Sequence, residues 1–96
     1  MLDTVSVLVC QGRCCRQQGS RQVLATFREL ADHRLQIEAS GCLGQCGHGP
    51  MVLIGSEPIW YERVQPVEIP FLIRQQVEAG IPACPMIYRR MHPQLC

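Results

Sequence analysis

The chain has 96 residues, 47% of them hydrophobic and 5% aromatic, and its formal net charge at pH 7 is +1. This length supports a single domain with one modest core, and no run approaches the roughly 20 apolar residues that span a bilayer. All nine basic residues are arginine. The lack of lysine excludes a Walker A phosphate loop and Schiff-base catalysis, because both need the amine, and the near-neutral charge does not indicate nucleic-acid binding.

The first predicted element is a buried strand over residues 4–9, TVSVLV, which are β-branched, apolar and of strand length. The strand ends at Cys10, where Gly12 begins an arginine-rich loop. The preceding residues include Asp3 and no basic segment, which favours a strand over a secretory signal. We therefore expect a cytoplasmic protein in a reducing compartment.

An amphipathic helix is predicted over residues 21–33, because Ser20 is a favourable N-cap and apolar residues then recur at helical spacing. These apolar residues are Val23, Leu24, Phe27, Leu30 and Ala31. Residues 35–39 alternate apolar with polar, which predicts a half-buried strand that leads the chain to Gly41 and Cys42. Cysteines are therefore expected at the ends of two strands.

The segments MVLI (residues 51–54) and IWY (residues 59–61) flank the turn-rich GSEP and predict an antiparallel hairpin. A second helix is predicted from Pro66, which suits the first helical position, to Gly80. Pro70 lies within about a turn of the helix start, where its lost hydrogen bond costs less than in a helix interior. The resulting order is β-α-β-β-β-α, an α/β fold.

One domain is expected over residues 1–80, since no internal repeat or second domain is visible. Residues 81–96 shift to a proline-rich, basic composition and are interpreted as a short C-terminal tail. In this tail Tyr88, Arg89 and Arg90 form a small basic spot. It is interpreted first as solvated surface and second as a docking site for an acidic redox partner.

Seven cysteines are the strongest functional signal, and an odd count without a secretory signal indicates metal or redox use rather than a disulfide framework. Two pairs, Cys10-x4-Cys15 and Cys42-x3-Cys46, lie in glycine-containing loops that each follow a predicted strand. A [2Fe–2S] cluster needs four thiolates and tolerates varied spacings. Spacing alone leaves open whether Cys14 or Cys15 is the second ligand, because adjacent side chains in an extended stretch point to opposite sides.

The glycines around the second cysteine pair also suit a loop that curls around a [2Fe–2S] cluster. They are Gly41, Gly44, Gly47 and Gly49. Glycine permits positive φ and close backbone approach, so amide N–H groups can point at sulfur atoms and stabilise their negative charge. His48 lies in the same loop and is a nitrogen ligand in principle, as in Rieske centres. With four cysteines available, it is interpreted as a solvent-facing residue that modulates the reduction potential.

Three segments, in this order, resemble the thioredoxin-like [2Fe–2S] ferredoxins: CQGRCCRQQGS, SGCLGQCGHGPMVLI and WYERVQPVEIP. The resemblance covers roughly residues 5–80 and extends to the small cluster-bearing subunit of NADH dehydrogenases and hydrogenases. It implies a thioredoxin-like fold, a [2Fe–2S] cluster, single-electron transfer and a homodimer. Carried onto this chain, the family ligands are Cys10, Cys15, Cys42 and Cys46. Cys14 falls at a position where relatives need no thiol.

Two other kinds of site compete for the cysteines. Structural zinc accepts four thiolates, but zinc ribbons usually use tight CxxC knuckles and neither pair has that spacing. A dithiol oxidoreductase needs CxxC at a helix N-terminus, and the chain contains no such motif. Cys84 and Cys96 are interpreted as tail thiols without an assigned role, with a redox-sensitive link between chains as the alternative.

The expected function is that of a soluble ferredoxin, which accepts one electron from a reductase, passes it to an acceptor enzyme and converts no substrate itself. An iron–sulfur redox sensor or accessory module is the alternative. Neither a membrane nor a nucleic acid is expected as a partner. Trp60 and Tyr61 are interpreted as strand packing or a dimer interface rather than an electron relay, because hairpin aromatics usually pack against their neighbours.

Overall fold

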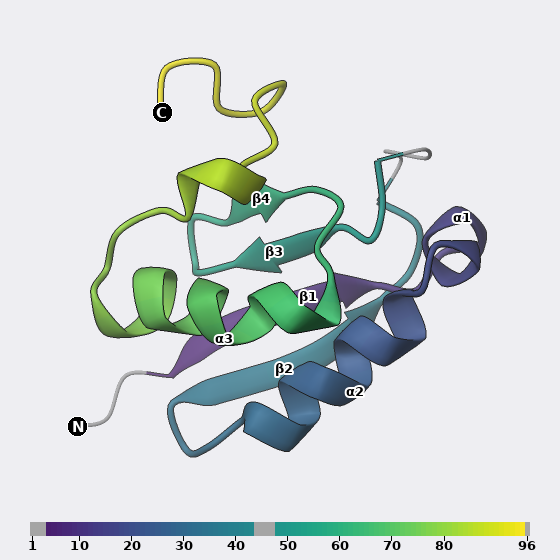
Figure 1. Ribbon diagram of the computed structural model, residues 1–96, viewed down its shortest axis with the longest axis horizontal. Helices are drawn as coiled ribbons and strands as arrows, with labels where there is room; N and C mark the ends of the chain where they lie inside the picture. Colours follow the sequence, from purple (N-terminus) through teal and green to yellow (C-terminus); the bar gives the residue numbers. More distant parts are fainter. Residues whose placement is uncertain (1–3, 44–47, 96) are drawn as a thin grey trace.

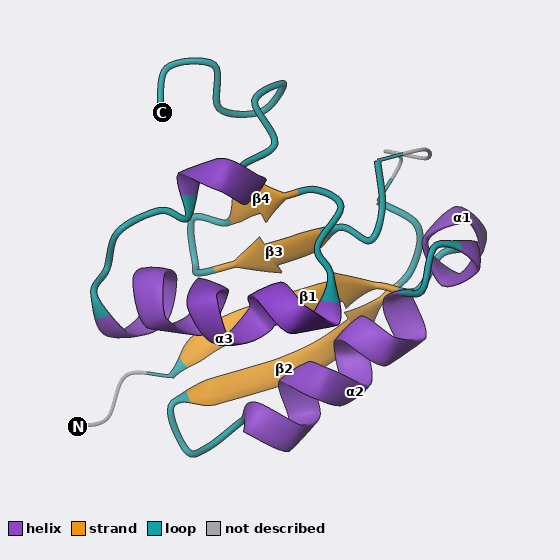
Figure 2. Cartoon of the chain, in the orientation of Figure 1, coloured by secondary structure: helices purple, strands orange, loops and turns teal. Residues whose placement is uncertain are grey.

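The computed structural model describes residues 4–43 and 48–95, apart from the side chain of Cys14. Its centre is a four-stranded sheet in the order β2-β1-β3-β4 (Figure 1). The strands are β1 (Val5–Cys10), β2 (Leu35–Ser40), β3 (Val52–Ile54) and β4 (Ile59–Tyr61). Figure 2 shows that α2 (Ser20–Leu30) and α3 (Ile69–Leu72) both lie over one face of this sheet. The predicted α/β class is confirmed.

Strands β1 and β2 run parallel, and helix α2 (Ser20–Leu30) lies in the crossover between them. In β1 the alternate residues Val7 and Val9 are fully buried. β-Branched side chains are stiff at χ1 and pack well on a pleated surface, so this sequence favours a central strand. Both strands agree with their predicted bounds to within one residue at each end.

Strands β3 and β4 form the predicted antiparallel hairpin, with Ile54 opposite Ile59. Strand β3 also pairs antiparallel with β1, which places the hairpin on the side of β1 away from β2. Gly55 adopts a φ of 103° in the connecting turn, a conformation that is easy for glycine because it lacks a Cβ atom.

A short helix, α1 (Arg13–Gln17), occupies the segment that we predicted to be an arginine-rich loop. Its first turn closes through a hydrogen bond of 2.9 Å from the Arg16 N–H to the Gly12 carbonyl oxygen. The extended stretch assumed for Cys14 and Cys15 is therefore wrong. Successive residues of a helix are about 100° apart rather than on opposite sides.

Helix α2 begins differently from the prediction. Ser20 is its first residue, and the N-cap is Gly19, in the left-handed region at a φ of 96°. Ser20 is buried, and its Oγ has no hydrogen-bond partner among the described residues. The capping signal was misleading because Gly19 makes the sharp turn between α1 and α2, which leaves Ser20 inside the second helix.

The second predicted helix is present but irregular. The chain passes from a 3-10 turn (Pro66–Glu68) through α3 (Ile69–Leu72) into a π-helical stretch (Ile73–Glu78). Pro70 lies within the first two positions of α3, where its missing N–H costs no helical hydrogen bond. The segment ends at Gly80, with a φ of 71°, as predicted.

Residues 83–88 pack onto the sheet edge. Ile87 forms an isolated antiparallel bridge with Tyr61, and the Tyr88 N–H donates to the Trp60 carbonyl oxygen over 2.8 Å. Tyr88 is only 3% exposed, so its interpretation as solvated surface is wrong. This segment covers the outer edge of β4 and contributes to the core. The domain boundary predicted before it stays a prediction.

The main core lies between the sheet and the helices α2 and α3, which cover the same face (Figure 1). Its fully buried residues are Val7, Val9, Val23, Phe27, Val52, Ile54, Tyr61, Val64, Ile69 and Leu72. Because strand residues alternate between faces, Leu8, Leu53 and Trp60 lie together on the opposite face. Leu8 and Trp60 are only half-buried there.

Candidate metal centre

Two of the predicted ligands meet where the parallel strands end. In the β1–β2 register Cys10 lies beside Ser40, and Cys42 follows Ser40 by two residues. The Gln11 N–H donates to the Ser40 carbonyl oxygen over 2.8 Å, which extends the pairing beyond the strands. Because the carboxyl ends of parallel strands meet at one edge of a sheet, the two cysteine loops leave the sheet side by side.

Gly12 brings these two loops into contact. A Cβ atom added to Gly12 would lie 2.8 Å from the Cα atom of Cys42, closer than side chains approach backbone. The neighbouring backbone therefore confines this position to glycine. We assigned no structural role to Gly12 from the sequence, although its place two residues after Cys10 was an available signal.

Helix α1 brings Cys15 back to Cys10, and both thiols are buried, at 4% and 2% exposure. Gly49 closes this side of the pair, because a Cβ atom there would lie 2.6 Å from the Cys15 sulfur. Cys42 is exposed. The site therefore has a buried pair of thiols and a third thiol at a solvent-facing edge.

Burial raises the pKa of the Cys15 thiol from its ordinary value of 9.0 to about 11. A hydrogen bond from the Met51 backbone lowers the same pKa, while the neighbouring Cys10 and Cys42 raise it. The packing of Cys10 against Cys15 and the close approach of Gly12 to Cys42 place the three thiols at the same edge of the sheet. A metal ion changes this balance, because a coordinating thiol is deprotonated outright.

Backbone amides point at two of the sulfur atoms. The Gly12 N–H donates to Cys10 Sγ over 3.4 Å, and the Met51 backbone donates to Cys15. Such donors stabilise the negative charge of a thiolate. The expectation that amides face the sulfurs is confirmed, although the donors belong to other residues than the glycines from which we argued.

Gly41 and Gly49, the two of the four predicted glycines that the structure describes, have a smaller part than predicted. Nothing lies within 4 Å of a Cβ atom added to Gly41, and neither Gly41 nor Gly49 has a positive φ. Only the close approach at Gly49 agrees with the prediction. Gly44, Gly47 and Cys46 lie outside the described residues.

The cysteine sulfurs of this site can be compared with the ligands that a single metal ion or an iron–sulfur cluster requires. In residues 4–43 and 48–95, no three His, Cys, Asp or Glu side chains gather closely enough to hold one metal ion. A [2Fe–2S] cluster differs because each iron takes two thiolates, so a buried pair with a third thiol beside it is the expected part of such a site. The all-sulfur donor set suits iron–sulfur ligation. The described thiols therefore fit the cluster, while the complete ligand set stays a prediction.

An apolar shell surrounds the buried thiols. Four residues pack around Cys10 and Cys15, and with them they form the cysteine end of the molecule: Leu43, Met51, Trp60 and Tyr88. Such a shell limits solvent access and so influences a reduction potential. Tyr88 carried no local sequence signal for this role, because its burial follows from the pairing of residues 83–88 with β4.

His48 lies beside the cysteine end. Its ring centroid is 5.1 Å from that of Tyr88, and its Nδ1 is 3.5 Å from a carboxylate oxygen of Glu62. The His48 side chain is 36% exposed. His48 thus lies between the apolar shell and solvent. This agrees in part with the expectation that it faces solvent.

Tyr61 connects the main core to residues 83–88. Its hydroxyl accepts a hydrogen bond of 3.1 Å from the Ala83 N–H and donates to Oε1 of Gln76. Tyr61 is fully buried, and this burial raises the pKa of its hydroxyl. The interpretation of Tyr61 as strand packing is confirmed.

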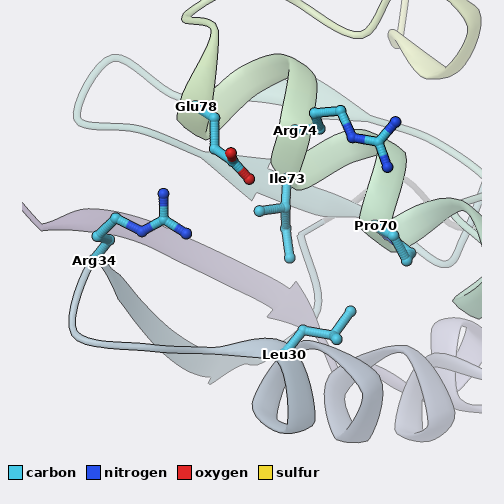
Figure 3. Close-up of a pocket in the computed structure, with 6 residues that line it drawn as sticks. All are labelled: Leu30, Arg34, Pro70, Ile73, Arg74 and Glu78. Atoms are coloured by element: carbon cyan, nitrogen blue, oxygen red, sulfur yellow. The ribbon is translucent and has the colours of Figure 1, made fainter.

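A hollow of about 250 Å³ lies near the amino end of β2, away from the cysteines. It is lined by Leu30, Arg34, Pro70, Ile73, Arg74 and Glu78 (Figure 3). Figure 3 shows that Leu30 comes from α2 and Ile73 from the neighbouring helical segment, with charged groups around them. These lining residues include no thiol, imidazole or hydroxyl, so the hollow lacks the usual nucleophiles and soft metal ligands.

Cys84, for which we found no role in the sequence, is disulfide-bonded in the structure. Cys96 lies outside the described residues. Among the helices of residues 4–43 and 48–95, none is long and apolar enough to cross a membrane.

Comparison with known proteins identifies the family. The model of the thioredoxin-like [2Fe–2S] ferredoxin family matches residues 2–76. A 2Fe–2S ferredoxin of Aquifex aeolicus (strain VF5) is 27% identical over 85 residues, covering 82% of this chain and 77% of its own length. A 2Fe–2S ferredoxin of Clostridium pasteurianum is 28% identical over 71 residues, covering 69% of this chain and 70% of its own.

Solved structures agree with this match. A crystal structure of the thioredoxin-like [2Fe–2S] ferredoxin of Aquifex aeolicus superimposes with a TM-score of 0.80 at 26% identity, covering 88% of this chain and 96% of the other. A second structure of that protein has a TM-score of 0.82 at 25% identity, covering 88% and 90%. The thioredoxin-like fold expected from the sequence is thereby confirmed. Since the family match also extends over most of the chain, this protein belongs to the thioredoxin-like [2Fe–2S] ferredoxins.

Proposed function

We propose that this chain is a one-electron carrier that holds one [2Fe–2S] cluster on Cys10, Cys15, Cys42 and Cys46, and that it converts no substrate itself. The observation that carries the proposal is the convergence of three thiols at one sheet edge, where backbone amides face two of the sulfurs. When bound, the cluster supplies a centre that gains and loses a single electron.

The chain's own residues have distinct parts in this proposal. Cys10 and Cys15 would hold one iron from the buried, apolar part of the site. The amides of Gly12 and Met51 offset the negative charge on these two sulfurs, an effect that grows in importance when an electron is added. Cys42, which is exposed, would hold the cluster from the solvent-facing edge of the site, the edge that a partner protein can approach.

Metal content tests the proposal directly. Protein purified without oxygen is expected to be reddish brown, to contain about two irons per chain and to become paramagnetic with one unpaired spin on reduction. Structural zinc is the competing site, since tetrahedral Zn²⁺ also accepts four thiolates. A colourless protein with one zinc per chain would contradict the electron-transfer function.

The ligand assignment has its own test. The Cys14→Ser variant is expected to keep the native visible and EPR spectra with full iron content. Cys15→Ser is expected to lose iron or to shift the spectrum, because an alkoxide is a harder ligand than a thiolate. If Cys14 replaces the missing thiol in the Cys15→Ser variant, the double variant distinguishes this rescue from ligation by serine. Loss of the cluster from Cys14→Ser alone, with Cys15→Ser unchanged, would reverse the assignment.

An iron–sulfur sensor is the alternative function for the same site, and the exposure of Cys42 favours it because oxidants reach an exposed thiol. Repeated cycles of dithionite and air, followed by the visible spectrum, separate the two functions. A carrier returns to the same absorbance after each cycle. A sensor loses its cluster or changes its oligomeric state during the first oxidations.

We propose a homodimer as the assembly. The half-buried Leu8 and Trp60 support it, since both leave apolar surface on the sheet face opposite α2 and α3. Light scattering at micromolar concentration is expected to give twice the chain mass. Leu8→Glu is expected to give a monomer, while Val67→Glu, at an 85% exposed helical position, serves as the matched control. A monomer mass for the unmodified protein would contradict this assembly.

Partners and location complete the proposal. A reductase and an electron acceptor are the partner proteins that a ferredoxin needs, and we place the protein in the cytoplasm. The support is the proposed site itself, since it needs cysteines as free thiolates and a reducing compartment keeps thiols reduced. Cell fractionation with an antibody against the chain tests the location, and recovery in a secreted fraction would contradict it.

A further inference from the structure

Three arginines gather beside the cysteine end without belonging to it. Arg13 and Arg16 lie three residues apart on α1, which places them on one side of that helix. Arg21 lies in the first turn of α2. Together with Gln17 these residues line a shallow hollow of about 340 Å³, and all four are exposed. Arg13, Arg16 and Arg21 form the arginine patch.

The chain does not neutralise this charge locally. Residues 11–28 contain four arginines and no aspartate or glutamate. The ion pairs of the described residues involve Arg34, Arg63 and His48, and none includes a member of the arginine patch. Since the whole chain has a net charge of only +1, the remaining segments are net acidic. The positive charge is therefore concentrated in one segment, which gives the molecule a directional field.

The arginine patch adjoins the solvent-facing edge of the site. Arg13 and Arg16 share the five-residue helix α1 with Cys15. Gly12, the residue before Arg13, approaches the backbone of the exposed Cys42 so closely that a Cβ atom would lie 2.8 Å from its Cα atom. A molecule that rests on these arginines is thus held next to the proposed cluster ligands.

We propose that the arginine patch is the docking surface for an acidic face of the electron-transfer partner. The inference rests on the proposed function, because it assigns the charge of the partner at that same site. Guanidinium groups pair with carboxylates in a planar, two-bonded geometry and are weakly hydrated, which suits a surface that forms and breaks contacts repeatedly. Complementary charge then speeds encounter and sets the orientation more than it tightens binding.

The shape of the hollow favours a protein surface over a small anion. It is shallow, and its lining consists of four exposed side chains. Small-molecule sites are instead concave and mostly apolar, with a few placed polar groups. The hollow therefore presents positive charge on an open surface and does not enclose a small ligand.

A charged electrode provides a partner surface of known chemistry. We expect the iron-loaded protein to exchange electrons faster at gold coated with a carboxylate-terminated monolayer than at an ammonium-terminated one, by roughly tenfold or more at low salt. The variant Arg13→Gln, Arg16→Gln, Arg21→Gln is expected to lose this preference. Its matched control replaces three other exposed arginines, Arg74, Arg89 and Arg90, by glutamine and is expected to keep it.

The outcomes separate this inference from the proposed function. If the unmodified protein shows no reversible one-electron wave at either electrode, the carrier function fails. If the wave is reversible but the rates at the two surfaces are equal, or if the control loses as much preference as the patch variant, the docking surface is wrong. Inorganic phosphate supplies the remaining comparison. If millimolar phosphate abolishes the preference while chloride at the same ionic strength does not, the arginines form a small-anion site, and docking of an acidic protein is overturned.

Iron content and the visible spectrum are measured on every variant before voltammetry. The substituted arginines are exposed and are not proposed ligands, so both quantities are expected to stay at the unmodified values. A patch variant that keeps its full iron content and its carboxylate preference would contradict the docking surface.

Discussion

The main core and the cysteine end are both buried, yet different interactions hold them together. The main core consists of apolar side chains from the sheet, α2 and α3, and almost none of them has a polar atom to satisfy. In the cysteine end the thiols of Cys10 and Cys15 are packed beside Met51 and Tyr88. Burial of apolar side chains stabilises the main core. In the cysteine end, burial opposes ionisation of the thiols, which is why the pKa of Cys15 is raised.

This difference implies that the two regions respond to different changes. The stability of the main core depends on apolar area and on the absence of voids. The cysteine end depends on exact distances between two backbone loops, since ligand deprotonation and metal binding are coupled there. A substitution in the main core should therefore affect the whole fold, while one in the cysteine end should affect iron content first.

The largest expected effect follows from Phe27→Ala in the main core. Phe27 is fully buried, so its truncation removes apolar contact and leaves a cavity, at a cost of about 3–5 kcal/mol in the free energy of unfolding. Urea denaturation followed by far-UV circular dichroism measures this cost. Leu30→Ala, on the same helix but 45% exposed, is the matched control and is expected to cost much less. Equal costs for the two variants would contradict the position of the core.

Gly12→Ala is expected to act on the cysteine end alone. Its Cβ atom would lie 2.8 Å from the Cα atom of Cys42, so the two cysteine loops must separate. We expect most of the iron to be lost while the far-UV circular dichroism stays native. Gly41→Ala is the matched control, because nothing lies within 4 Å of its added Cβ atom. Full iron content in Gly12→Ala would show that the loops tolerate separation.

Tyr61→Phe tests the connection between the main core and residues 83–88. It leaves the buried Ala83 N–H without its acceptor, which is expected to cost about 1–3 kcal/mol in the free energy of unfolding. Denaturation at neutral pH measures this change. A cost below that of an exposed substitution would mean that the hydroxyl contributes nothing.

The same tyrosine also predicts a pH dependence. Burial raises the pKa of the Tyr61 hydroxyl above its ordinary value of 10.0, so the folded state retains a proton that the unfolded state loses. The associated stability is complete below pH 10 and is lost as the pH rises through the folded-state value. Unfolding experiments above pH 10 are expected to show this loss in the unmodified protein and less of it in Tyr61→Phe. Identical alkaline limbs would contradict the assignment to this hydroxyl.

The smallest expected effect belongs to an exposed pair outside both regions. Hydrogen bonds from the Arg34 side chain and backbone lower the pKa of Asp32 below its ordinary value of 3.8. The resulting stability is present above that value and is lost as the pH falls through the lower folded-state value. Asp32→Asn is expected to lower the free energy of unfolding slightly at neutral pH and to flatten the acid limb of the unfolding profile, because the carboxylate is the group that titrates there and solvent screens exposed pairs. A large change at neutral pH would contradict this interpretation.

Much of the framework could be predicted from local sequence. The β-branched run at residues 4–9, the alternation at 35–39 and the hairpin around GSEP each agree with the structure because their hydrophobic period matches the element that forms. The same reasoning missed α1. The short segment from Arg13 to Gln17 carries no apolar periodicity, and the turn at Gly19 decides where one helix stops and the next begins.

The candidate site, too, was only partly predictable from local sequence. The residue types and their order along the chain were enough to identify the family and to propose the cysteine ligands, because thiolate chemistry is a property of the side chain itself. The requirement for glycine at position 12 and the burial of Tyr88 depend on the pairing of β1 with β2 and of residues 83–88 with β4. Contacts between segments distant in sequence leave no local pattern. They exist only once the sheet has brought those segments to the same edge.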